Sequence, residues 1–284
     1  MTILVTGSNG QLGNCIQARA EQFPETHFLF TDVDTLDITD KEAVATLVKA
    51  QNVDIIINCA AYTAVDKAEE QETLCRKINA TAPQILGEVA ANAGARVIHV
   101  STDYVFDGKS FRPYQETDTT CPVSAYGRTK REGEEALLSA CPNSVIIRTA
   151  WLYSEYGSNF VKTMLRLSAE RESLNVIFDQ VGTPTYAGDL ADAILCIAHK
   201  KVMDFHPSIY HFSDEGVCSW YDFTVKILQL AGRQCTVNPI ETKDYPTPAA
   251  RPHYSVLNKT KIKTTYSIHI PHWEESLKRL IEKL

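Results

Sequence analysis

The first 150 residues of this 284-residue chain alternate between short apolar runs and longer amphipathic stretches. The apolar runs are rich in β-branched residues and predict buried strands at 2–6, 27–31, 53–60, 96–101 and 144–149. The stretches between them predict a helix from Asp40 to about residue 50, mostly helical structure over 66–94, and a helix over 126–141. This alternation predicts an α/β fold of the Rossmann type, with a doubly wound parallel sheet.

Beyond residue 150 the alternation loosens and prolines become frequent. The pattern predicts helices over 159–171, 188–200 and 219–231, and a terminal helix that Pro271 opens. Short strands are predicted at 174–178, 209–212 and 235–237. We expect a smaller carboxy-terminal lobe that closes over the first domain.

Composition narrows the class of partner. The formal net charge is −7 and no block of Lys and Arg occurs, which argues against a nucleic-acid binder. No apolar run approaches the roughly 18 residues of a membrane span, and the first residues already predict a strand, so we expect no signal peptide. The eight cysteines are scattered with no Cys-x-x-Cys pair. We therefore expect a cytoplasmic protein with reduced cysteines and small-molecule partners.

Three glycines follow the first predicted strand and lead into the first helix. Gly7, Gly10 and Gly13 have the spacing Gly-x-x-Gly-x-x-Gly. A strand that turns into a helix through glycines aims free backbone N–H groups at one point, where a pyrophosphate of a dinucleotide can bind. An ordinary glycine-rich turn is the alternative, because the motif alone is weakly specific.

Tyr126 and Lys130 are the strongest candidates for chemistry. Four residues apart on a predicted helix, they share one face. An ammonium close to a phenol would lower its pKa from about 10 by about 2 units, toward the working pH of a proton donor. Thr102, at the carboxyl end of the fourth predicted strand, could hold the same substrate oxygen. Two surface neighbours are the alternative reading, but the glycine turn and Thr102 favour a nicotinamide-dependent enzyme.

These motifs resemble those of the extended short-chain dehydrogenase/reductases, which carry Gly-x-x-Gly-x-x-Gly and Tyr-x-x-x-Lys. Within that family the chain looks most like the dTDP-4-dehydrorhamnose reductases. The matching segments are 10–13, 60–69, 100–106, 148–151, 179–185 and 245–252. They extend over most of the chain.

The resemblance implies reduction of the 4-keto group of dTDP-4-dehydro-6-deoxy-L-mannose to dTDP-L-rhamnose. It implies that Tyr126 donates the proton, that Lys130 binds the nicotinamide ribose, and that Thr102, Asp103 and Trp151 contact the sugar. It makes 1–150 a dinucleotide-binding domain and 151–284 mainly a substrate-binding lobe, with about 159–200 returning to the sheet. The residues that it places around the cofactor are Gly7, Gly10, Gln11, Leu12, Asp32, Asp37, Ile38, Ala61, Tyr62 and Thr63, with Tyr126 and Lys130.

Several of these roles have simpler alternatives. Trp151 could be a core or rim aromatic residue, and Asp103 a turn residue. Arg251 could bind the diphosphate through its planar guanidinium, or it could be a surface arginine. Asp32 can accept hydrogen bonds from the adenine ribose and repel a 2′-phosphate, so NADH is expected to be preferred over NADPH by roughly 1–2 kcal/mol. No Lys or Arg occurs from residue 31 to 39 to offset that repulsion.

One position departs from the family pattern. Some members are described as dimers bridged by magnesium through an acidic residue at the position of Cys15, and a thiol is a poor magnesium ligand. We therefore expect no metal, and a monomer or homodimer without that bridge. The rival functions are another nucleotide-sugar epimerase or dehydratase, and a non-catalytic regulatory subunit of methionine adenosyltransferase. A dehydratase of this superfamily usually has an acidic pair after the catalytic Thr, and here only Asp103 is acidic.

Overall fold

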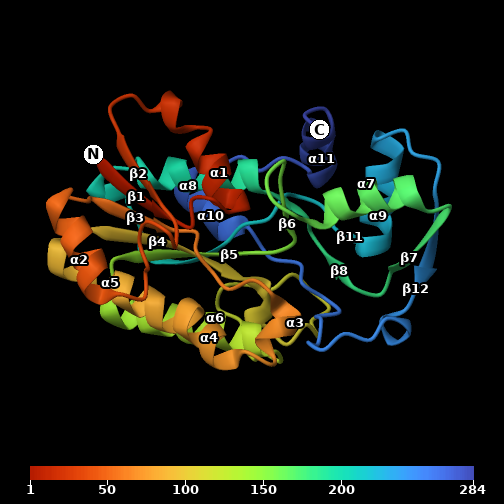
Figure 1. Cartoon of the computed structure of the whole chain (residues 1–284), viewed down its shortest axis with the longest axis horizontal. Helices are drawn as coiled ribbons and strands as arrows, with labels where there is room; N and C mark the ends of the chain where they lie inside the picture. Colours follow the sequence, from red (N-terminus) through yellow and green to blue (C-terminus); the bar gives the residue numbers. More distant parts are fainter.

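A computed structural model describes residues 1–284. Its centre is a six-stranded parallel sheet in the order β10-β5-β4-β3-β1-β2, which agrees with the predicted α/β fold (Figure 1). The strand order reverses between β1 and β3, and in such sheets the crevice at this reversal binds ligands. The strands are β1 (Thr2–Thr6), β2 (His27–Thr31), β3 (Ile55–Asn58), β4 (Arg96–Thr102), β5 (Ser144–Thr149) and β10 (Ser208–His211).

Helices cover both faces of the sheet (Figure 1). Successive side chains of a strand point to opposite faces, so Ile3 and Val5 join the core on one face and Leu4 joins the core on the other. This is why apolar residues occupy successive positions in these strands rather than every second one. The first face packs on α1 (Gln11–Gln17), α8 (Ala187–Ala198) and α10 (Thr260–Tyr266), and the second on α2 (Lys41–Ala50), α5 (Ala82–Ala93) and α6 (Ala125–Ala140).

The link from β3 to α5 is helical, as the sequence predicts, but it is broken into short pieces. It runs through α3 (Val65–Ala68), α4 (Glu72–Arg76) and one π-helical turn, η2 (Lys77–Thr81). Single π-helical turns are rare and often occur at functional sites. The predicted cap of α2 is confirmed, since the Asp40 carboxylate accepts the backbone N–H groups of Glu42 and Ala43.

A second, smaller core lies beyond β5, at the right in Figure 1. Here β7 (Ser173–Ile177) pairs with β12 (Thr236–Ile240). The pair packs with α7 (Phe160–Glu170), α9 (Trp220–Leu230) and α11 (Trp273–Ile281). Two short pairs lie beside it: β6 (Leu152–Tyr153) with β9 (Thr185–Tyr186), and β8 (Val181–Gly182) with β11 (Cys218–Ser219).

The chain passes more than once between the sheet and this second core. Of the segment 159–200, α8 packs on the sheet, whereas α7 and β7 belong to the second core. The predicted strand near 209–212 is β10, which extends the main sheet beside β5. Helix α10, which the sequence pattern did not indicate, packs on the same sheet. The division at residue 150 stays a prediction. None of the helices combines the length and apolar character that a membrane crossing requires.

Candidate active site

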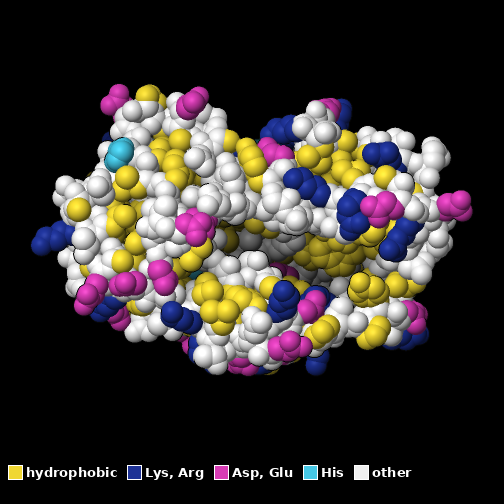
Figure 2. Space-filling view, in the orientation of Figure 1, with side chains coloured by type: hydrophobic (Ala, Val, Ile, Leu, Met, Phe, Trp, Pro, Cys, Tyr) yellow, Lys and Arg dark blue, Asp and Glu magenta, His cyan; other side chains and the backbone are white.

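A cleft of about 1000 Å³ runs along the carboxyl edge of the sheet. It is visible as the hollow near the centre of Figure 2. Its walls come from the loops after β1, β2, β3 and β4, from α6, and from the segment after β5. The cleft therefore lies where the strand order reverses, at the position expected for a ligand of this fold.

The glycine turn after β1 leaves no room for side chains. Gly7 has φ +66°, and a Cβ there would lie 2.6 Å from the backbone nitrogen of Ala60. A Cβ on Gly13 would lie 2.4 Å from the carbonyl oxygen of Gly7. Backbone atoms rather than side chains therefore form this wall of the cleft. The turn fits a cofactor pyrophosphate, which needs close backbone approach.

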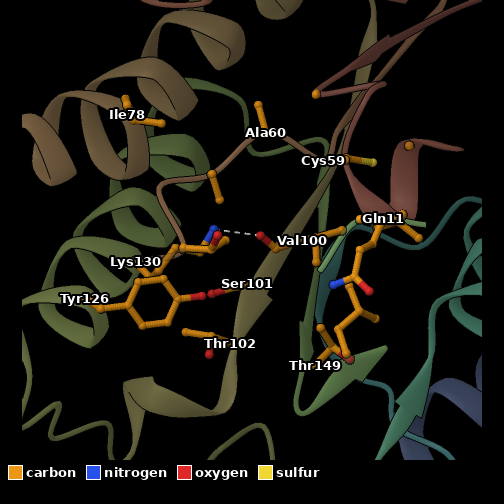
Figure 3. Close-up of a pocket in the computed structure, with 18 of the residues that line it drawn as sticks. Gln11, Cys59, Ala60, Ile78, Val100, Ser101, Thr102, Tyr126, Lys130 and Thr149 are labelled. Carbon is orange, nitrogen blue, oxygen red and sulfur yellow. Dashed lines mark hydrogen bonds between the residues drawn. The ribbon is translucent and has the colours of Figure 1, made fainter. Parts of the chain in front are cut away.

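Tyr126 and Lys130 both line this cleft from α6, together with Thr102 at the end of β4. In Figure 3 the phenol of Tyr126 points toward Ser101 and Thr102. A buried ion pair fixes the helix that carries them: the guanidinium of Arg148 on β5 donates to both carboxylate oxygens of Glu134, at 2.8 and 2.7 Å. The sequence-predicted catalytic residues thus meet in one place.

The expected effect of Lys130 on Tyr126 is wrong for this structure. Lys130 Nζ donates to the carbonyl oxygen of Val100 at 2.7 Å, drawn as the dashed line in Figure 3, and lies 3.3 Å from His99 Nε2. Burial raises the pKa of Tyr126, and the Thr102 hydroxyl only partly opposes this. Sharing a helix face brings two side chains near each other, but it does not aim the ammonium at the phenol. Tyr126 consequently stays protonated, as a proton donor must.

Asp103 is buried next to Thr102. The Thr102 hydroxyl donates to Asp103 Oδ1 at 3.0 Å, while Oδ2 has no hydrogen-bond partner. Burial raises the pKa of Asp103 to about 7. Asp103 also lines the cleft. Contact of Asp103 with the sugar stays a prediction.

We call the part of the cleft that is lined by Thr102, Asp103, Tyr126 and Lys130 its catalytic end. The other end of the cleft is more open to water. There the carboxylate of Asp32 accepts the backbone N–H groups of Asn9 at 2.9 Å and Val33 at 2.8 Å, which hold it in place. Asp37 accepts from Thr39, and this bonding lowers the pKa of Asp37. We call this region the Asp32 end of the cleft.

Lys77 also lines the Asp32 end, and sequence reasoning missed it. It lies on η2, far along the chain from Asp32, and its charge contributes to the lowered pKa of Asp37. The sequence around the glycine turn contains no signal for it. The segment 31–39 has no Lys or Arg, as noted above, but Lys77 brings a cation to this end from another part of the chain.

Trp151 lines the cleft with an unusual backbone. It has φ +49°, which is uncommon for a bulky residue, and its ring stacks on Trp220 at 3.5 Å between centroids. Trp151 is half-buried, at the rim between the cleft and the second core. Sequence reasoning missed Trp220, which has no motif around it.

Most of the other predicted cofactor residues also line the cleft, but two predicted residues do not. Arg251 instead donates to Asp66 Oδ2 at 2.6 Å. The hydroxyl of Tyr62 donates to Gln71, outside the cleft. The predicted residues that do line it are Gly7, Gly10, Gln11, Leu12, Asp32, Asp37, Ile38, Ala61, Thr63, Thr102, Asp103, Tyr126, Lys130 and Trp151.

Gln11 connects the glycine turn to the segment beyond β5. Its Oε1 accepts from Ser154 Oγ and from Asn159 Nδ2, each at 3.0 Å. Asn159 also lines the cleft. The sequence singled out neither partner, because both bonds join residues more than 140 positions apart.

Cys15 is buried in the core beneath the glycine turn. Burial raises the pKa of its thiol to about 12, so it is neutral near pH 7. No group of three or more His, Cys, Asp or Glu side chains is arranged to hold a metal ion.

Over its whole length the chain is similar to known proteins in sequence and in structure. The model of the RmlD substrate binding domain matches residues 1–284. The dTDP-4-dehydrorhamnose reductase of Sinorhizobium fredii is 43% identical over 288 residues, which covers 99% of this chain and 97% of the relative. A crystal structure of a dTDP-4-dehydrorhamnose reductase from Clostridium acetobutylicum has a TM-score of 0.95 at 44% identity, covering 100% of this chain and 99% of that one. The Bacillus anthracis enzyme in complex with NADP has a TM-score of 0.94 at 37% identity, covering 100% and 99%.

Proposed function

The chain belongs to the dTDP-4-dehydrorhamnose reductase family, and we propose that it reduces the 4-keto group of dTDP-4-dehydro-6-deoxy-L-mannose to give dTDP-L-rhamnose. The reaction is a nicotinamide-dependent oxidoreduction in nucleotide-sugar biosynthesis. The observation that carries the proposal is one cleft lined by the glycine turn and by Thr102, Tyr126 and Lys130.

Each of these groups has a distinct task. A bound NADH or NADPH supplies the hydride to the carbonyl carbon. Tyr126 gives its phenolic proton to the carbonyl oxygen, and the Thr102 hydroxyl holds that oxygen in place. The Lys130 ammonium binds the ribose hydroxyls next to the nicotinamide. Asp103 and Trp151 contact the sugar.

The proposal includes a modest preference for NADH. Its support is that the Asp32 carboxylate, which would accept hydrogen bonds from the adenine ribose, is held in place by two backbone N–H groups. Lys77 works in the opposite direction, because a cation at this end attracts a 2′-phosphate. We therefore expect both cofactors to be used.

Three further assignments belong to the proposal. The protein is a monomer or a homodimer without a magnesium bridge, since Cys15 stands at the position of the acidic ligand. The activity is cytoplasmic. Arg251 binds the diphosphate only if the cleft closes on it, because its present partner is Asp66.

The test is net oxidation of NADH or NADPH with the dTDP keto sugar, beside a thermal-shift panel of dTDP-, UDP- and GDP-sugars. A ligand that binds only the folded state raises the melting temperature. We expect turnover and the largest shift with dTDP-sugars. Interconversion of UDP-sugars without net cofactor oxidation would favour an epimerase. Absence of turnover, with co-purification of methionine adenosyltransferase, would favour the regulatory subunit.

A further inference from the structure

A chain of buried polar groups leads from β1 to Lys130. It passes from Thr6 on β1 to Asn58 on β3 and His99 on β4, all of which are almost completely buried. The Thr6 hydroxyl donates to Asn58 Oδ1 at 2.8 Å, Asn58 Nδ2 lies 2.9 Å from His99 Nδ1, and His99 Nε2 lies 3.3 Å from Lys130 Nζ. None of the three residues has a task in the reaction described above.

The orientation of the Asn58 amide follows from its neighbours. The backbone N–H of Ala60 can only donate, and it points at Asn58 Oδ1 from 3.1 Å. A reversed amide would place an NH₂ group against this N–H. Asn58 therefore presents its NH₂ group to His99 Nδ1, which must accept.

This contact fixes the tautomer of His99. A neutral imidazole has one donor and one acceptor nitrogen, so an accepting Nδ1 leaves the proton on Nε2. That N–H points at Lys130 Nζ. A neutral amine can accept it, whereas an ammonium has only donors and cannot.

We propose that Asn58 and His99 are positioning residues that weaken the hold of Lys130 on its proton by presenting an N–H group to its amine. When Lys130 is charged, either the contact with His99 or the contact between His99 and Asn58 must lose its hydrogen bond. When Lys130 is neutral, both contacts are satisfied. Lys130 can then exchange its proton in the physiological pH range.

The other groups around Lys130 do not cancel this effect. The titratable groups that face it are Glu134 on its own helix, Cys75 on α4, His99 on β4, and Tyr126 one turn earlier. The charge of Glu134 is paired with the guanidinium of Arg148. Burial raises the pKa of Cys75, and its thiol is therefore neutral. Burial lowers the pKa of Lys130 to about 8 and keeps His99 neutral by lowering the pKa of its imidazole.

The kinetic test is the pH profile of kcat/KM for the keto sugar. Reduction needs charged Lys130 and protonated Tyr126, and the pKa of Tyr126 is raised, so the alkaline limb follows the pKa of Lys130. Activity is lost as pH rises through that value. His99→Phe removes the N–H group, and Asn58→Asp accepts from Nδ1–H and so reverses the tautomer. Both should move the limb upward by about one pH unit or more.

Thr6→Val is the matched control. It removes a hydroxyl from the same chain of groups, but the N–H of Ala60 still orients Asn58. We expect a lower melting temperature and an unmoved alkaline limb. Unmoved limbs in both folded variants, His99→Phe and Asn58→Asp, would overturn the proposal.

The pH profile depends on the proposed function, because it needs turnover of the keto sugar. A second experiment therefore uses the wild-type protein without substrate. Nitrogen-15 NMR of labelled histidines distinguishes the two tautomers. We expect a His99 ring with a protonated Nε2 and an unprotonated Nδ1 at a pH above the pKa of Lys130, where the amine is neutral and both contacts are satisfied. A protonated Nδ1 at that pH would overturn the inference even if the protein is an active reductase, and lack of turnover would affect only the proposed function.

Discussion

The two ends of the cleft differ in how far water reaches their functional groups. At the catalytic end Lys130, Thr102 and Asp103 are buried, and burial shifts the pKa values of Lys130 and Asp103. At the Asp32 end, Asp37 and Lys77 are exposed. Charges act strongly where water is excluded and are screened where it is not. The catalytic end should therefore control turnover by orders of magnitude, and the Asp32 end should only adjust the choice of cofactor.

The largest effect is expected for Tyr126→Phe. This change keeps the ring but removes the transferable proton, so kcat should fall about 10²–10⁴-fold while cofactor binding stays nearly unchanged. Steady-state kinetics and a cofactor titration measure the two quantities. Tyr210→Phe, which loses a phenol bonded to His206 outside the cleft, is the control and should keep its turnover. A Tyr126→Phe enzyme with most of its kcat would remove Tyr126 from the mechanism.

Lys130→Met should affect both binding and turnover. Methionine keeps the length of the side chain but cannot donate to ribose hydroxyls, and a hydrogen bond from a charged group contributes about 1.5–3 kcal/mol. Cofactor affinity should fall roughly 10- to 100-fold, together with kcat. Isothermal titration with NADH measures the first and initial rates the second. Unchanged cofactor affinity would show that Lys130 does not bind the ribose.

At the Asp32 end we expect a smaller effect. Wild-type enzyme should prefer NADH about ten- to thirty-fold in kcat/KM, and Asp32→Ala should reduce this ratio because the repulsion of a 2′-phosphate is lost. Lys77→Met should increase the ratio. Asp34→Asn removes the same charge from an exposed side chain outside the cleft and should leave the ratio unaltered. A wild-type preference for NADPH would contradict the role given to Asp32.

Trp151→Ala should have the smallest kinetic effect. Loss of aromatic contact of about 0.5–1.5 kcal/mol would raise KM for the sugar nucleotide roughly 2- to 10-fold. Loss of the stacked pair with Trp220 should also lower the melting temperature by a few degrees. Trp220→Leu removes the ring that stacks on Trp151 but leaves Trp151 itself in the cleft. It should lower the melting temperature with less change in KM. A large loss of stability with KM unchanged would make Trp151 a structural residue only.

Features that depend on neighbouring residues could be predicted from the sequence. The first five strands of the sheet follow from short, mainly apolar runs, the start of α2 from Asp40, and the turn from Gly7, Gly10 and Gly13. Tyr126 and Lys130 could be paired because helical spacing places them on one face. In each case the physical cause acts within a few residues along the chain.

Features that depend on distant contacts could not be predicted. Lys77 reaches the Asp32 end only because η2 lies beside the cleft. Lys130 points to Val100 rather than to Tyr126 because the backbone carbonyl oxygen of Val100 on β4 accepts its hydrogen bond. The place of β10 in the main sheet depends likewise on pairing with β5. Periodicity specifies which residues are buried, but it does not specify their partners.

Transfer of deuterium from NADH that carries deuterium at both nicotinamide C4 positions to the dTDP keto sugar tests the central claim most directly. The account predicts one deuterium at C4 of dTDP-L-rhamnose for each cofactor oxidised, and loss of this product with Tyr126→Phe. Conversion of a nucleotide sugar with no net oxidation of the cofactor, or with no deuterium in the product, would contradict it.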